Sequence, residues 1–86
     1  MRVLSVAEIT SYIRELVEYD PILSDVWIRG EVSNFSRSAA GHMYFCMTSD
    51  DVQVNCVLFR GNQHGILAIP RNGDSVLAHG RVAIYE

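Results

Sequence analysis

The chain has 86 residues, with seven arginines, no lysine and ten acidic residues, which give a formal net charge of −3. This charge excludes a polycation that holds nucleic acid by net charge alone, and the length excludes a large multi-site enzyme and predicts one domain. No apolar run approaches the roughly 20 residues of a membrane span, and two cysteines are too few for a disulfide-stapled secreted domain. We therefore expect a cytoplasmic domain with no membrane segment.

The first predicted element is a helix from about Ser5 to Tyr19. Ser5 followed by Glu8 matches the S-x-x-E capping box, in which each side chain binds the amide of the other residue. The helix ends at Asp20-Pro21, because the residue before a proline avoids helical backbone. Its apolar stripe recurs at three- and four-residue steps, at Val6, Ile9, Ile13, Leu16 and Val17.

From Leu23 the apolar period changes from 3.6 to 2, which predicts strands for the rest of the chain. In the first strand the inward positions are Val26, Ile28 and Val32, and the outward positions are Trp27, Arg29, Glu31 and Ser33. Gly30 stands in the middle, where a strand can bend or bulge. The small and polar stretch from Ser36 to Gly41 predicts a loop.

A hairpin of two strands is predicted next, joined by a turn at Ser49-Asp50-Asp51. The second strand alternates Met43, Phe45 and Met47 with His42, Tyr44 and Cys46. The third alternates Val52, Val54, Cys56 and Leu58 with Gln53, Asn55, Val57 and Phe59. Cys46 and Cys56 thus fall on opposite faces of the hairpin, which argues against a disulfide between them.

The last third of the chain contains a weak pattern, a strong turn signal and one more strand. Residues 61–69 allow one short helical turn, and Pro70 to Asp74 is rich in turn formers. A fourth strand is predicted from Ser75 to Tyr85, with Gly80 at its middle. Its inward positions are Val76, Ala78, Val82 and Ile84.

One helix followed by four short strands, two of them with a central glycine, predicts a small curled antiparallel barrel. Residues 1–22 would form the helix and a linker, and residues 23–86 the barrel. Four strands do not close a barrel, and the fourth reaches Glu86 without a following turn. We therefore expect a fragment of a longer protein, whose open strand edge from Val76 to Tyr85 promotes self-association.

Catalytic and metal sites find no support in the sequence. His42, His64 and His79 have no Asp, Glu or Cys at metal-ligand spacing, and Asp50-Asp51 reads as a solvated turn. The glycines lack the strand-to-helix context of a phosphate loop. We expect no catalytic residue, no metal and no cofactor.

The outward face of the predicted sheet is more informative. It gathers aromatic, amide and arginine side chains, namely Trp27, Arg29, His42, Tyr44, Asn55 and Phe59. Rings that stack on bases beside arginines that pair with phosphates are what a single-stranded nucleic acid requires. The alternative is that Trp27 or Phe59 packs under the helix or against another part of the protein.

The charges around this face predict weak binding. The plausible phosphate contacts are Arg29, Arg37, Arg60 and Arg81, and the acidic residues close to them in sequence are Glu31, Asp50 and Asp51. Few net positive charges mean few released counterions and therefore little electrostatic affinity.

Five segments, in this order and spacing, resemble the N-terminal domain of the exodeoxyribonuclease VII large subunit family: LSVAEITSYIRELVE, DVWIRGEVSNF, GHMYFCM, VQVNCVLFRGN and NGDSVLAHGRVAIYE. The runs WIRGEVSNF, GHMYF and VLFRGN are distinctive together. The resemblance implies an oligonucleotide/oligosaccharide-binding (OB) fold, a Greek-key antiparallel barrel, preceded by a helix and here without its last strand.

The resemblance also implies which residues lie on or beside the single-strand-binding face: Trp27, Arg29, Glu31, Ser33, Asn34, Phe35, His42, Tyr44, Phe59 and Arg60. The family usually has a Lys-Asp pair where this chain reads Thr48-Ser49-Asp50-Asp51, and commonly a basic residue at Asn55. Both departures lower the positive charge of the face. The family's nuclease residues and the helical region that binds small subunits would follow Glu86.

The leading interpretation is a single-stranded-DNA-binding module that presents DNA to a nuclease domain outside this chain. A second is an RNA-binding barrel, because anticodon-binding domains of some aminoacyl-tRNA synthetases share a strand with R-G-x-V and a following G-x-x-x-F. A third is a scaffold whose sheet face meets other domains and binds no nucleic acid.

Overall fold

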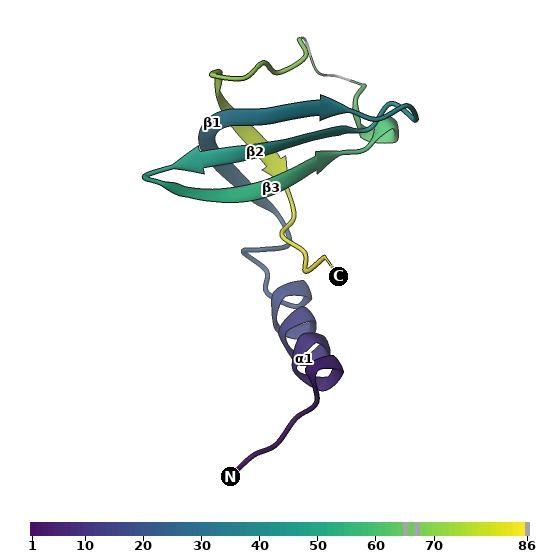
Figure 1. Cartoon of the computed structure of the whole chain (residues 1–86), viewed down its shortest axis with the longest axis vertical. Coiled ribbons are helices and arrows are strands. Elements are labelled where there is room, and N and C mark those ends of the chain that lie inside the picture. The colour runs from purple at the N-terminus through teal and green to yellow at the C-terminus, as the bar shows by residue number, and fades with distance from the viewer. Residues whose placement is uncertain (65, 67, 86) are drawn as a thin grey trace. The chain divides into compact units, whose positions relative to one another are not determined.

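The computed structural model describes residues 1–64, 66 and 68–85. Its elements in chain order are α1 (Val6–Glu18), β1 (Val26–Arg37), β2 (Met43–Ser49), β3 (Val52–Leu58), the short 3-10 helix η1 (Arg60–Asn62) and β4 (Ser75–Gly80) (Figure 1). The chain divides into two units, one of residues 1–28 with 78–86 and one of residues 29–77. The helix and four strands match the predicted element order.

Helix α1 begins and ends where the sequence predicts. The Ser5 hydroxyl accepts from the Glu8 amide at 3.1 Å, and the Glu8 carboxylate accepts from the Ser5 amide at 3.3 Å, so the capping box is complete. After the helix, the Asp20 carboxylate accepts from the amides of Ile22 and Leu23, which fixes the turn that Asp20-Pro21 begins. The predicted helix is confirmed.

The four strands form one sheet in the order β3-β2-β1-β4, in which β1, β2 and β3 are antiparallel neighbours (Figure 1). Between β2 and β3, Ser49 pairs with Val52, so the loop is the dipeptide Asp50-Asp51. Both aspartates have positive φ, 50° and 63°, which is the backbone of the two-residue hairpin turn that suits twisted strands. The sheet is open, as expected for four strands.

Strand β1 differs from its predicted form in length and in the position of its irregularity. Its register with β2 shifts by one residue between Ser33 and Ser36, so the bulge lies at Asn34, with φ of 51°, and not at Gly30. Pairing then resumes, with Ser36 opposite Tyr44 and Arg37 opposite Met43. The loop predicted from Ser36 therefore begins only after Arg37. The bulge accommodates Asn34 as an extra residue, and strand pairing continues beyond it.

The core lies on one face of this sheet. Cys46, which points to the opposite face, is buried as well. Val32 and Met43 are each 1% exposed, and Phe45 and Met47 are also buried. The Phe35 and Phe45 rings stack with their centroids 6.5 Å apart. Phe45 thus faces inward as predicted, whereas Val54, on the edge strand β3, is 44% exposed although it lies opposite Met47.

The predicted fourth strand is too long. β4 ends at Gly80, and the chain after it leaves the ladder, where the Val82 amide donates to the Leu23 carbonyl at 2.8 Å. The edge from Val76 to Tyr85 is therefore shorter than predicted. The turn before β4 is confirmed, because Gly73 has φ of 93° and Asp74 bonds back to Arg71.

Between β3 and β4, the helical turn expected within residues 61–69 appears as η1. Within that range, Gly65 and Leu67 lie outside the described residues.

We predict that Gly30→Ala destabilises the protein and that Gly80→Ala, the matched control, does not. A Cβ on Gly30 would lie 3.2 Å from the Thr48 carbonyl oxygen and 3.3 Å from Met47 Cβ, whereas one on Gly80 would meet nothing within 4 Å. Overpacking of this kind costs about 1 to 3 kcal/mol. Urea unfolding followed by circular dichroism measures both variants, and equal stabilities would contradict the close packing at Gly30.

Candidate nucleic-acid interface

Within residues 29–77, the sheet face opposite Val32, Met43 and Met47 carries the predicted contact side chains. The register places Tyr44 opposite Val57 and Cys46 opposite Asn55 on this outward face. Tyr44 is 42% exposed and Phe59 is 43% exposed, so both rings are open to a ligand while one side of each rests on the protein. The register supports the faces predicted for β2 and β3, but burial alternates only in part. Cys46 is buried although it faces outward, and the β3 residues from Val52 to Asn55 are all exposed, as suits an edge strand.

His42 and Phe59 meet at the ends of β2 and β3. Their rings pack edge to face, with centroids 5.5 Å apart and planes at 82°. The Arg60 amide donates to His42 Nδ1 at 3.0 Å. Because this nitrogen acts as an acceptor, the neutral ring carries its proton on Nε2, which is a donor suited to a phosphate or a base carbonyl.

The loop between β1 and β2 is fastened to the end of β3 by Gln63. Its Nε2 donates to the Gly41 carbonyl at 2.7 Å and to the Leu58 carbonyl at 3.0 Å, and its Oε1 accepts from Arg37 at 3.4 Å. Gly41 has φ of 90°, and a Cβ there would lie 3.4 Å from Arg60 Cδ, so the stem of Arg60 rests against this glycine. The Gln63 side chain therefore joins Gly41 and Leu58, the residues that directly precede His42 and Phe59.

The positive charge of this unit is available to a ligand. In the part of the chain that the structure describes, no carboxylate pairs with the guanidinium of Arg29 or Arg60, and both residues are exposed. Glu31, two residues from Arg29 in β1, is exposed as well. The face thus offers cations to phosphates but keeps an acidic side chain close to one of them.

Asn55 belongs to a short chain of polar contacts across the sheet. The Cys46 thiol donates to Asn55 Oδ1 at 3.3 Å, and Asn34 Nδ2 lies 3.8 Å from Cys46 Sγ. The carbonyl oxygen of Asn55 is used here, and its amide NH₂, which contacts no acceptor among the described residues, can reach a base.

Both cysteines are free. Cys56 pairs with Phe45 and Cys46 with Asn55, which confirms that the two thiols lie on opposite faces of the hairpin. Burial raises the pKa of the Cys56 thiol, and the nearby Cys46 raises it further. Cys56 is therefore a weak nucleophile at neutral pH.

Three of the residues predicted to contact nucleic acid lie outside the outward face described above. Trp27 belongs to the unit of residues 1–28 and 78–86, where its indole stacks on His79 with centroids 4.5 Å apart. Phe35 follows the bulge and stacks on Phe45 at the core face. Arg81 is exposed and follows β4 in the same unit as Trp27.

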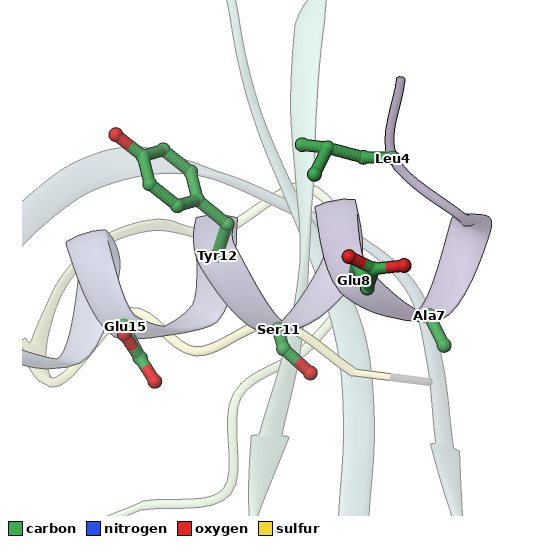
Figure 2. A pocket seen from close by; sticks show the side chains of 6 residues that line it. All are labelled: Leu4, Ala7, Glu8, Ser11, Tyr12 and Glu15. Atoms are coloured by element: carbon green, nitrogen blue, oxygen red, sulfur yellow. The ribbon is translucent and has the colours of Figure 1, made fainter. Parts of the chain in front are cut away.

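A hollow of about 440 Å³ runs along α1, lined by Leu4, Ala7, Glu8, Ser11, Tyr12 and Glu15. Figure 2 shows these side chains spread along the helix and the segment just before it. The lining comes from α1 and the residue Leu4 just before it, so the hollow is open, and its carboxylates would repel phosphates. We therefore do not assign a nucleic-acid site to it.

Two further features are absent from residues 1–64, 66 and 68–85. No group of three or more His, Cys, Asp or Glu side chains is placed to hold a metal ion. No helix there has the length and apolar character that a membrane span requires.

Comparison with known proteins gives a family match over residues 4–86, to a model described as an OB-fold nucleic acid binding domain. The open antiparallel sheet with its N-terminal helix agrees with that fold, and the OB fold predicted from the resemblance is confirmed.

The chain is similar to proteins named Exodeoxyribonuclease 7 large subunit. The protein from Halalkalibacterium halodurans is 40% identical over 84 residues, which is 98% of this chain and 18% of that protein. Those from Bacillus thuringiensis and Bacillus anthracis are 41% identical over 83 residues, or 96% of this chain and 18% of theirs. The resemblance seen in the sequence motifs is confirmed, and the chain spans about a fifth of the length of these relatives.

We predict that Gln63→Met lowers the free energy of unfolding by about 1 to 3 kcal/mol, because two backbone carbonyls lose their donor while the side-chain volume is kept. Amide hydrogen exchange should also become faster at Gly41, whose loop is no longer fastened. Gln53→Met is the control, since Gln53 is an exposed residue of β3. Unchanged exchange at Gly41 would show that the loop is held by other contacts.

Proposed function

The chain belongs to the family of OB-fold nucleic acid binding domains, and from this premise we propose that it is the single-stranded-DNA-binding module of an exodeoxyribonuclease large subunit. The module holds a single strand and presents it to a nuclease domain outside these residues. Residues 1–22 serve as helix and linker, and residues 23–86 as the binding barrel. The nuclease activity and the small-subunit partner belong to the longer protein.

The observation that supports this proposal most is the cluster at the ends of β2 and β3. Exposed rings of Tyr44 and Phe59 lie on the same outward face as the ring of His42, and the Arg60 guanidinium has no carboxylate partner among the described residues. Bases stack on such rings without regard to sequence, and guanidinium groups pair with the phosphates between them. The proposed contact residues are Trp27, Arg29, His42, Tyr44, Asn55, Phe59 and Arg60.

DNA is proposed in preference to RNA because the relatives are named as deoxyribonucleases. We also place the module in the cytoplasm, where reducing conditions keep thiols such as Cys46 and Cys56 free. Competition between DNA and RNA oligonucleotides of the same sequence tests the choice of nucleic acid. Stronger binding of the RNA would favour an anticodon-binding type of domain.

We predict that Tyr44→Ala and Phe59→Ala each weaken binding of a labelled single-stranded oligonucleotide by about 1 to 3 kcal/mol, with little change in stability. Each ring is more than 40% exposed, so its loss removes a stacking surface and little core volume. Phe45→Ala is the contrast, because that buried ring should cost about 3 to 5 kcal/mol of folding free energy. A lowered melting temperature with unchanged affinity in Tyr44→Ala and Phe59→Ala would identify these rings as packing residues.

We predict a shallow dependence of affinity on salt. With at most about four arginines at phosphates and a slope of about −0.7 per contact, the plot of log K against log salt should be no steeper than about −3. Fluorescence anisotropy at several salt concentrations measures it. A slope near zero, or no binding at low salt, would favour the scaffold that binds no nucleic acid.

A further inference from the structure

We propose that Trp27, backed by His79 and Asp25, is a second nucleobase-stacking site, in which His79 and Asp25 are positioning residues. The inference rests on the proposed function, which already counts Trp27 among the contact residues, and adds to it a positioning role for His79 and Asp25. All three residues belong to the unit of residues 1–28 and 78–86.

The three side chains form an ordered series from carboxylate to indole. Asp25 Oδ1 bonds to His79 Nε2, and the imidazole lies almost parallel to the indole, with centroids 4.5 Å apart and planes at 8°. The carboxylate fixes the ring plane of His79, and the stacked imidazole restricts rotation of the Trp27 side chain. A flat aromatic surface is thereby held in one orientation before any ligand arrives.

The second face of the indole is open. Trp27 is 64% exposed although one of its faces is covered by the imidazole, so most of that exposed area must belong to the other face and the ring edge. A tryptophan whose role is core packing would be far more buried. An open indole face is a large aromatic surface on which a base can stack.

The contact between Asp25 and His79 contributes little to stability. The side chains are 76% and 49% exposed, and ion pairs at such positions add only a small amount of free energy because water screens them. The main effect of this contact is therefore to orient the imidazole ring of His79.

The charge of the cluster selects the part of the nucleic acid that binds there. Asp25 is anionic and would repel a phosphate placed beside it, whereas the uncharged indole face accepts any base. The ligand class is therefore a nucleobase of a single strand, because a base within a duplex has no free face.

The test uses the fact that Trp27 is the single tryptophan of the chain, so that emission excited at wavelengths which the four tyrosines do not absorb reports on this ring alone. Titration with short oligothymidylate should quench the emission, while anisotropy of a labelled oligonucleotide measures total binding. In His79→Ala we expect the quenching at saturation to fall to less than half and the affinity to fall about 3- to 10-fold, because the unsupported indole becomes mobile. Asp25→Asn should show the same trend to a smaller degree.

Two matched variants separate positioning from general effects. His79→Phe keeps a ring against the indole and should retain most of the quenching. His64→Ala removes an exposed histidine outside the cluster and should leave both readouts unchanged. Thermal melting of each variant shows that the fold persists.

The outcomes distinguish this inference from the proposed function. Binding seen by anisotropy with unchanged Trp27 emission would overturn the second stacking site and leave the proposed function standing. Full quenching in His79→Ala would overturn the positioning role. No binding in either readout would overturn both.

Discussion

The bulge at Asn34 is the constraint on which the division between packing and binding depends. Before it, Val32 lies opposite Met47 on the core face, and after it Ser36 lies opposite Tyr44 on the outward face. An unbroken alternation from Val32 would point Asn34 and Ser36 inward and Phe35 outward. The extra residue reverses this, so that Phe35 stacks on Phe45 and the polar side chains leave the core.

The bulge also connects the core to the outward face. Asn34, in left-handed backbone, places its amide near Cys46, whose thiol contacts Asn55 on β3. Three strands are thus linked through their outward side chains beside the exposed ring of Tyr44. A face with such internal contacts is more rigid than one of isolated polar residues, and rigid rings lose less entropy when a base stacks on them.

Local patterns predicted much of the fold, and distant contacts account for what they missed. The Ser5 and Glu8 capping box and the Asp50-Asp51 hairpin depend on residues within a few positions, so the sequence alone identifies them. The bulge depends on pairing with β2, and the ends of β1 and β4 depend on which neighbour continues the ladder. Gln63 and His79 form hydrogen bonds to residues that are 22 and 54 positions away, respectively. Short-range sequence patterns do not predict contacts over such separations.

The charge of the chain explains why rings and their supports carry so much of the proposed site. With a net charge of −3, attraction to phosphates is small, so affinity must come from stacking, which depends on ring orientation more than on charge. In each unit an aromatic ring is held by a histidine that is itself fixed by a hydrogen bond: His42 beside Phe59 by the Arg60 amide, and His79 beside Trp27 by Asp25. Under the proposed function, oriented rings with few phosphate contacts would hold a single strand without the strong, salt-dependent attraction of a basic surface, which suits a module that must pass the strand on.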